Sequence, residues 1–196
     1  MKIYLDTSAL IKLYIIEPGS EIINKIISEN ASPLPIWDLH LIEFHNALKL
    51  KVFRKELNDS EALHLGVLFN GRKESGIYYS PELDRKIHTE LCLKLTDISS
   101  KIGCRSLDIM HIAAASLFQV DQIITFDIKQ AELAEQVGIH MVCPVEKDSG
   151  LGDRAGSTSM NRDQPRLIRS EPLLDTPAIA IAVRILFFIF KLSITT

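Results

Sequence analysis

Residues 3–10 read Ile3-Tyr4-Leu5-Asp6-Thr7-Ser8-Ala9-Leu10, a short apolar run that stops at an acid and two hydroxyl residues. Residues 3–5 are β-prone, and the apolar positions from Leu10 onward recur at helical spacing, so we predict a strand, a polar turn and a helix. Residues 122–126, followed by Asp127 and another helical pattern, repeat this order. Strands separated by helices predict an α/β fold with a parallel sheet covered on both faces.

The same alternation continues up to about residue 147, which we take as the end of the folded domain, 1–147. Glycine and proline positions and the apolar periodicity predict short strands over residues 33–37, 77–80 and 140–143. Helices are predicted over residues 22–30, 38–55, 59–70, 81–101, 106–118 and 128–137, with Ser106 as a cap and Gly138 as a stop.

The carboxy-terminal part differs in composition. Residues 148–177 are rich in Gly, Ser, Pro, Asp and Arg, which is typical of a linker or a disordered tail. Residues 178–196 are strongly apolar, but Arg184 and Lys191 interrupt them, and they fall short of a convincing membrane span. Three interpretations stay open for them: a partner-binding helix, a weak membrane anchor, or an extension foreign to the domain.

Composition limits the class of protein. The chain has 196 residues, 46% of them hydrophobic and 24% charged, which predicts one globular domain with a substantial core. The three cysteines are widely spaced and form no C-x-x-C pair, which fits a reducing cytoplasm, and the first residues lack the uninterrupted apolar stretch of a secretion signal. A net charge of −3 gives no overall attraction to nucleic acid, so phosphate chemistry would have to recruit cations locally.

Three aspartates are candidate functional residues because of their positions. Asp6 and Asp127 each directly follow a predicted strand, and Asp108 lies in the first turn of the helix after Ser106. Ligands of open α/β sheets bind where the chain leaves the carboxyl ends of the strands. Each aspartate also has a structural alternative, because it could cap the next helix or interact with its dipole.

Glu43 has a weaker structural explanation. It shares a helix face with Leu39, Ala47 and Leu50, a stripe that we expect to face the core. An ionised group buried there needs a partner, and the chain offers no obvious inward-facing arginine. Carboxylates crowded at one sheet edge are neutralised best by a divalent cation, and oxygen ligands suit Mg²⁺ or Mn²⁺. Such an ion can support phosphodiester hydrolysis without a protein nucleophile.

Up to about residue 147, these motifs resemble the PIN-domain ribonuclease family, in particular the VapC-type toxins of toxin–antitoxin pairs. The resemblance rests on four stretches: residues 5–10, Glu43 with 46–48, residues 105–115, and 125–127 followed by Ala131, Ala134 and Gly138. It departs from the family at His40, where relatives often carry Ser or Thr, and in the tail after Lys147.

The resemblance implies a three-layer α/β/α domain with a central parallel sheet and an endoribonuclease that acts on single-stranded RNA or structured tRNA; rRNA and mRNA are further candidate substrates. It implies a Mg²⁺ or Mn²⁺ centre held by Asp6, Glu43, Asp108 and Asp127, a homodimer, and a cognate antitoxin protein that blocks the site. The alternatives are a non-catalytic PIN-like module that binds RNA or protein and, less favoured, a membrane-associated interaction protein.

Further residues have candidate roles around this centre. Arg105 could hold a substrate phosphate or a neighbouring acid, and Thr7 and Ser8 could orient Asp6 or a water molecule. A zinc site is disfavoured because no H-E-x-x-H motif is present. We interpret His111 as packed or hydrogen-bonded within its helix. We expect the histidines His45, His64 and His88 at the surface or at helix edges. The basic run Lys49, Lys51, Arg54 and Lys55 is expected on a solvated helix face, and it could also contact RNA.

Overall fold

The computed structural model describes residues 1–30, 32–144 and 166–167 of the chain. Its elements, in order, are β1 (Ile3–Leu5), α1 (Thr7–Leu10), the 3-10 helix η1 (Ile11–Leu13), β2 (Ile15–Ile16), α2 (Ser20–Ser28), β3 (Leu34–Pro35), α3 (Asp38–Phe53), α4 (Asp59–Glu74), β4 (Tyr78–Tyr79), α5 (Arg85–Ile102), α6 (Ser106–Leu117), β5 (Gln122–Ile124), α7 (Ile128–Gln136), β6 (His140–Val142) and β7 (Arg166–Leu167).

Each predicted strand and helix is present, with shifts at the helix ends, while the short strands β2 and β7 were not predicted. α5 begins at Arg85 rather than near residue 81, because the Asp84 carboxylate accepts hydrogen bonds from the backbone N–H groups of Lys86 and Ile87 and starts the helix there. The cap of α6 is Arg105, one residue before the predicted Ser106. Gly138 follows the end of α7 with a φ of 78°, which suits glycine.

The fold is mixed α/β with a small parallel sheet, in the strand order β1-β5-β6. Strands β1 and β5 lie side by side with Leu5 opposite Ile124, so both end at the same sheet edge. The predicted strands near residues 34 and 78 do not join this sheet; they form a separate parallel pair, β3 with β4. The antiparallel pair of β2 with β7 brings residues 166–167 back to the amino-terminal part of the chain.

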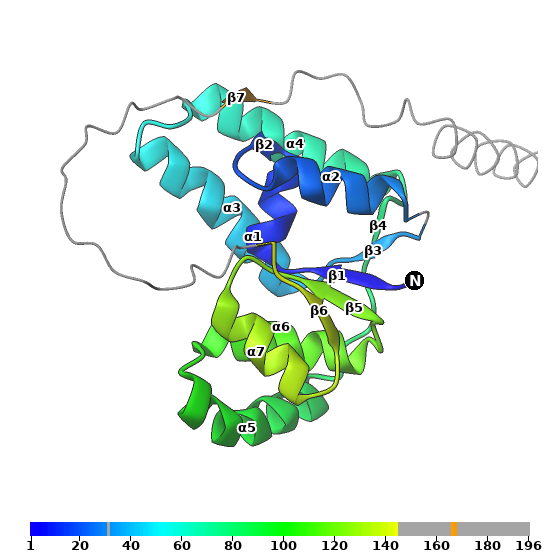
Figure 1. Ribbon diagram of the computed structural model, residues 1–196. Helices are drawn as coiled ribbons and strands as arrows, with labels where there is room; N and C mark the ends of the chain where they lie inside the picture. Colours follow the sequence, from blue (N-terminus) through cyan, green and yellow to red (C-terminus); the bar gives the residue numbers. More distant parts are fainter. Residues whose placement is uncertain (31, 145–165, 168–196) are drawn as a thin grey trace, which may run out of the picture.

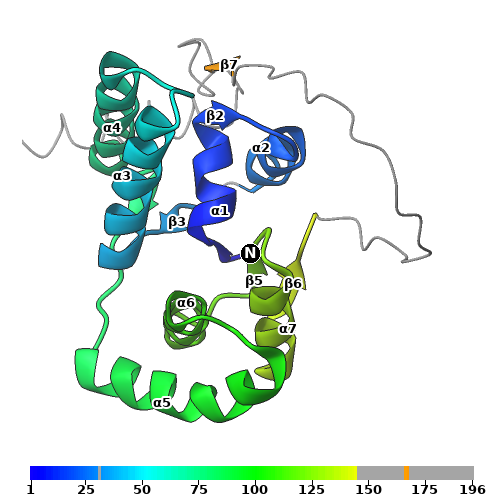
Figure 2. The same cartoon turned by 90° about the vertical axis from the view of Figure 1, so that its left-hand side faces the viewer.

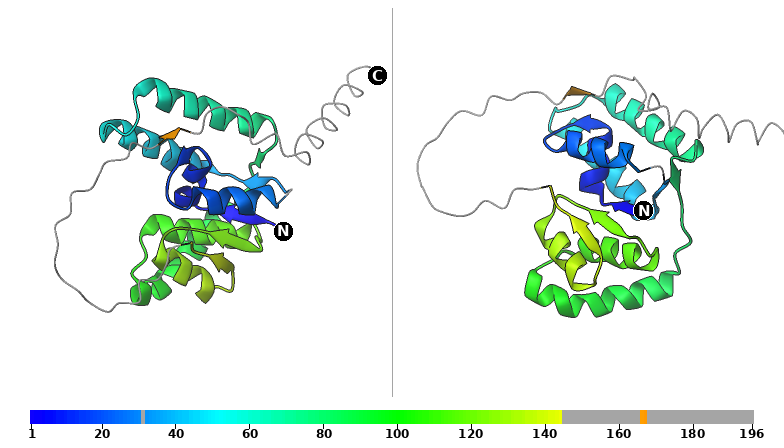
Figure 3. Two further views of the ribbon diagram at one scale, coloured as in Figure 1. Left: turned by 45° about the horizontal axis from the view of Figure 1, so that its top comes forward. Right: turned by 45° about the vertical axis from the view of Figure 1, so that its right-hand side comes forward.

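Side chains of β1 alternate between two hydrophobic clusters, as the two-residue period of a strand requires. Ile3 and Leu5 pack with residues of α1 to α4, whereas Tyr4 packs with residues of α5 to α7. Figure 1 shows α1 to α4 above the sheet of β1, β5 and β6 and α5 to α7 below it, and the views in Figures 2 and 3 show the same division. Helices therefore pack against β1 from both sides.

Of the helices in the described part of the chain, none has the length and apolarity needed to cross a membrane. Most of the carboxy-terminal part for which we made predictions lies outside the described residues. This applies to the apolar segment 178–196 and to residues 148–165 and 168–177 of the proposed linker.

Candidate metal and substrate site

The carboxyl ends of β1 and β5 place Asp6 and Asp127 at one edge of the sheet. The backbone N–H of Asp6 donates to the carbonyl oxygen of Ile124 at 3.1 Å, so the strand pairing continues up to the acid itself. Asp127 follows β5 and begins α7. Asp108 lies in the first turn of α6, and its pKa responds to the charge of Asp127, so these two acids are electrostatic neighbours.

All three aspartates make the cap contacts that the structural alternative predicted. Oδ1 of Asp6 accepts from the backbone N–H of Ala9 at 2.8 Å, and Oδ1 of Asp127 accepts from that of Lys129 at 2.8 Å. Oδ2 of Asp108 accepts from the backbone N–H of Arg105 at 2.9 Å. Within the described part of the chain, the second oxygens of Asp108 and Asp127 accept no hydrogen bond. Capping therefore leaves one oxygen on each of these two acids free for a ligand.

Asp6 is the most enclosed of the acids, with only 5% of its surface exposed. Its carboxylate accepts hydrogen bonds from Ser8 Oγ at 2.7 and 2.9 Å and from Thr125 Oγ1 at 2.8 Å. Burial raises the pKa of Asp6, while His111 and these hydrogen bonds act in the opposite direction without cancelling the effect. Among the described residues, no lysine or arginine forms a salt bridge with Asp6. Ser8 thus orients Asp6, as expected.

The hydroxyl of Thr125 is shared between Asp6 and Gln130. Thr125 Oγ1 lies 2.8 Å from Asp6 Oδ2 and 2.6 Å from Gln130 Oε1, and it also accepts from the backbone N–H of Asp127 at 3.0 Å. One hydroxyl hydrogen cannot serve two acceptors, so either Asp6 is protonated or the Gln130 amide turns its Nε2 toward Thr125. That Nε2 is buried and has no hydrogen-bond partner in the described chain. The sequence analysis missed both residues.

Glu43 is held by two hydrogen bonds to the same oxygen. Oε2 accepts from Thr7 Oγ1 and from His111 Nε2, each at 2.6 Å. Burial works to raise its pKa, but the bonds with His111 and Thr7 outweigh burial, and the pKa of Glu43 is lowered. The partner is therefore neither an arginine nor, within the described residues, a set of metal-ligating acids. Leu50, expected to share the buried stripe, is 41% exposed, because the face of α3 that packs on the core runs through His40, Phe44 and Leu48 and leaves Leu50 outside it.

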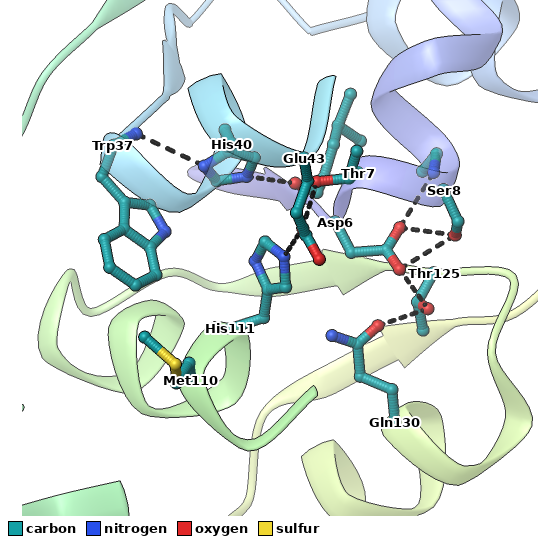
Figure 4. Close-up of polar contacts among 12 residues, drawn as sticks. Asp6, Thr7, Ser8, Trp37, His40, Glu43, Met110, His111, Thr125 and Gln130 are labelled. Atoms are coloured by element: carbon teal, nitrogen blue, oxygen red, sulfur yellow. Dashed lines mark hydrogen bonds and ion pairs between the residues drawn. The ribbon is translucent and has the colours of Figure 1, made fainter. Parts of the chain in front are cut away.

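A chain of hydrogen bonds fixes His111. The indole Nε1 of Trp37 donates to Tyr4 Oη at 2.7 Å, and Tyr4 Oη lies 2.6 Å from His111 Nδ1. Because the ionised Glu43 carboxylate can only accept, His111 Nε2 carries the hydrogen of their bond, and the neutral ring then accepts the Tyr4 hydroxyl hydrogen at Nδ1. In Figure 4 the His111 ring stands between Trp37 and Asp6. The interpretation of His111 as hydrogen-bonded is confirmed, but its partner on Glu43 was not foreseen.

The other histidines do not favour zinc. His40 is fully buried; its Nδ1 accepts from the backbone N–H of Trp37 at 3.3 Å and its Nε2 lies 2.8 Å from the Leu5 carbonyl oxygen. Burial lowers the pKa of His40 to about 3, so the ring is neutral with both nitrogens occupied. His88 was predicted at the surface or at a helix edge, and this is wrong: it is buried where α5 packs on α6, with Nε2 3.0 Å from the Met110 carbonyl oxygen. His45 and His64 are exposed as predicted.

The carboxylate oxygens of Asp6, Asp108 and Asp127 are donors of the kind that a divalent cation prefers. Burial raises the pKa of Asp108; the Arg105 backbone N–H opposes this and the charge of Asp127 adds to it. Buried and mutually repelling carboxylates of this kind are what a cation would stabilise. Over residues 1–30, 32–144 and 166–167, no group of three or more His, Cys, Asp or Glu side chains is arranged to hold a metal ion.

The basic candidates separate into two kinds. Arg105 is exposed at the start of α6, beside Asp108, and its role toward substrate stays a prediction. Lys51 was expected on a solvated face, but it is partly buried and forms salt bridges with Glu17 and Glu56. Lys49, Arg54 and Lys55 are exposed, and Lys49 pairs with Asp59 at 3.2 Å.

Comparison of the chain with models of known protein families gives no match, and no curated protein matches it either.

Proposed function

We propose that this protein is a Mg²⁺- or Mn²⁺-dependent endoribonuclease with a PIN-like, three-layer α/β/α fold. One observation carries the proposal: Asp6 and Asp127 follow neighbouring parallel strands at one sheet edge, with Asp108 as an electrostatic neighbour. In the described part of the chain, no lysine or arginine forms a salt bridge with any of the three. Perturbed acids gathered in this way are typical of functional sites.

In this proposal Asp6, Asp108 and Asp127 hold the metal ion. When bound, the ion activates a water molecule and offsets charge on the attacked phosphate. Ser8 and Thr125 keep the Asp6 carboxylate oriented, and the backbone N–H groups of α6 and α7 keep Asp108 and Asp127 facing the same edge. Outer contacts of this type normally tune a metal site.

Glu43 positions the attacking water. His111 and Thr7 occupy its Oε2, and within the described chain Oε1 accepts no hydrogen bond, so Oε1 is available to a water molecule. The lowered pKa keeps Glu43 ionised and therefore able to accept a hydrogen bond from that water. Arg105, at the exposed side of Asp108, is the residue that we propose for the substrate phosphate.

The resemblance to VapC-type toxins extends this proposal to partners. The substrate is RNA, whether tRNA, rRNA or mRNA; the active species is a homodimer in the cytoplasm; and a cognate antitoxin protein blocks the site. The second candidate, a non-catalytic PIN-like module that binds RNA or protein, is favoured by one observation. The aspartates already serve as caps, and no set of three metal-ligating side chains is assembled in the described residues.

One experiment separates the two functions. The purified full chain is incubated with total RNA in Mg²⁺, in Mn²⁺ and with a chelator, beside the variants Asp6→Asn and Asp108→Asn. We expect metal-dependent cleavage that each substitution reduces on the order of 100-fold. Asp97→Asn, on the exposed face of α5, is the matched control and should cleave like the wild type. RNA binding without cleavage in either metal would favour the non-catalytic module; cleavage that survives the chelator would rule out the metal mechanism.

A further inference from the structure

A cleft of about 510 Å³ lies beside the acidic site and takes no part in the proposed chemistry. It is formed by the start of α3, the segment between β4 and α5, the first turns of α5, and α6. Its lining includes Trp37, Asp38, Ser80, Arg85, Thr89 and Met110. Ligand pockets of small molecules have volumes of about 300–1,000 Å³, so the cleft is large enough for a nucleobase.

The cleft and the acids are separated by a single aromatic ring. The Trp37 and His111 ring centroids are 6.3 Å apart, and His111 bonds Glu43 on its other side. Met110, also in the lining, is the neighbour of His111 in the chain. Figure 4 shows Trp37 and Met110 on one side of the His111 ring and Asp6 on the other. Only the His111 ring therefore lies between Trp37, in the wall of the cleft, and Glu43.

The lining combines an aromatic surface with two charges of opposite sign. Trp37 can contact the face of a base, which is how proteins commonly bind unpaired bases. Asp38 and Arg85 are both exposed, and neither forms a salt bridge within the described part of the chain. The Asp38 carboxylate is therefore available to accept hydrogen bonds from a ligand, and the Arg85 guanidinium is available to donate them.

Guanine is the base whose edges suit both charges. Its N1–H and N2–H donate side by side and fit a carboxylate, while its O6 and N7 accept and fit a guanidinium. Uracil offers one ring N–H, and cytosine and adenine each offer one amino group, so none of them presents two adjacent donors from different atoms to Asp38. We propose that this cleft binds an unpaired guanine base, with Asp38 and Arg85 as its polar contacts; that an RNA strand supplies the guanine rests on the proposed nuclease function.

Trp37 is the only tryptophan of the chain and reports directly on the cleft. Its fluorescence is measured in the full-length Asp6→Asn variant with chelator present, so that RNA is not cut. The ligands are guanosine, adenosine, cytidine and uridine monophosphates, and the five-nucleotide RNAs UUGUU, UUAUU and UUUUU. We expect saturable quenching by the guanine ligands, with UUGUU binding at least about tenfold more tightly than UUUUU.

Variants assign the contacts. Asp38→Asn and Arg85→Ala should each weaken binding of UUGUU about tenfold while leaving UUUUU unchanged. Asp97→Asn and Arg54→Ala, both at exposed positions, are the matched controls and should bind like the parent. Equal binding of all bases, a preference for UUAUU, or no effect of either cleft substitution would overturn the assignment.

Comparing the RNA and mononucleotide ligands shows whether the guanine comes from an RNA strand or from a free nucleotide. The same measurements test the guanine site independently of the nuclease function. Tighter binding of UUGUU than of guanosine monophosphate identifies an RNA strand as the source, whereas equal affinity identifies the free nucleotide; both support a guanine site. The binding measurement needs neither metal nor cleavage. A guanine preference in a protein that never cuts RNA would therefore support the guanine site and contradict only the proposed nuclease function. Cleavage of RNA without any guanine preference in binding would support the nuclease function and contradict the guanine site.

Discussion

Two carboxylates near the amino terminus, Asp6 and Glu17, show how differently this chain treats buried charge. Glu17 forms salt bridges with Lys12, at 3.3 Å, and with Lys51, whose side chains are 11% and 12% exposed. Although burial opposes it, these bonds lower the pKa of Glu17. Asp6 is more enclosed and receives only hydrogen bonds, and its pKa is raised.

The difference indicates that Glu17 stabilises the fold, whereas Asp6 is kept for a ligand or a reaction. An ion pair such as that of Glu17 satisfies both partners within the chain and ties α3 to the segment after β2. At the sheet edge, burial raises the pKa of Asp6, and burial together with the charge of Asp127 raises the pKa of Asp108. Proteins tolerate such destabilised groups where a ligand or a reaction uses them.

Glu17→Gln tests the structural half of this contrast and should have the largest effect on stability. It leaves Lys12 and Lys51 without a carboxylate in a partly buried setting, which we expect to lower the free energy of unfolding by about 2 kcal/mol. Urea unfolding followed by circular dichroism measures this loss. Glu21→Gln, exposed on α2, is the matched control. RNA cleavage should be unchanged in both, and a loss of cleavage at full stability would show that Glu17 is not merely structural.

Tyr4→Phe tests whether the hydrogen-bond chain to Glu43 matters for function. The variant keeps the ring but removes the group that accepts from Trp37 and donates to His111 Nδ1, so the hydrogen that His111 presents to Glu43 is no longer fixed. We expect kcat for RNA cleavage to fall about tenfold with KM little changed. Tyr79→Phe, at a 38% exposed tyrosine, is the control. Equal losses in both variants would mean that the chain of bonds has no positioning role.

Asp6→Asn tests whether Asp6 is held for a function at the expense of stability. It should have the smallest effect on stability, and we expect it to stabilise the protein. Because the folded pKa of Asp6 is raised, ionisation costs the folded state stability above that pKa, and the cost disappears as the pH falls through it. Asparagine removes this charge, keeps an oxygen for the cap to Ala9, and offers Thr125 an N–H.

At neutral pH with chelator, the variant should therefore melt a few degrees above the wild type, for a gain of about 1 kcal/mol. The advantage should shrink toward acid pH, and added Mg²⁺ should raise Tm of the wild type alone. Thermal unfolding with and without the ion measures all three. A lower Tm for the variant at neutral pH would mean that Asp6 is held ionised by the fold, as Glu17 is.

The local pattern of the sequence was enough for the elements and the position of three acids. The β-prone apolar run of residues 3–5 and the helical periods elsewhere depend on near neighbours, and an acid directly after a strand lies at the sheet edge wherever the strand goes. Errors appeared where this local rule met tertiary packing: His88 is covered by α6, and Leu50 lies outside the face of α3 that packs on the core.

By itself, then, the sequence determined the alternation of strands and helices and the placing of Asp6, Asp108 and Asp127 at strand ends and helix starts. Only the tertiary structure decided the partners of the charges: His111 for Glu43, Lys51 for Glu17, and the cleft shared by Asp38 and Arg85. The physical reason is that Glu43 and His111 are 68 positions apart in the chain. Secondary structure is encoded over a few residues, whereas the neutralisation of a charge depends on which distant side chain the packing brings within hydrogen-bond distance.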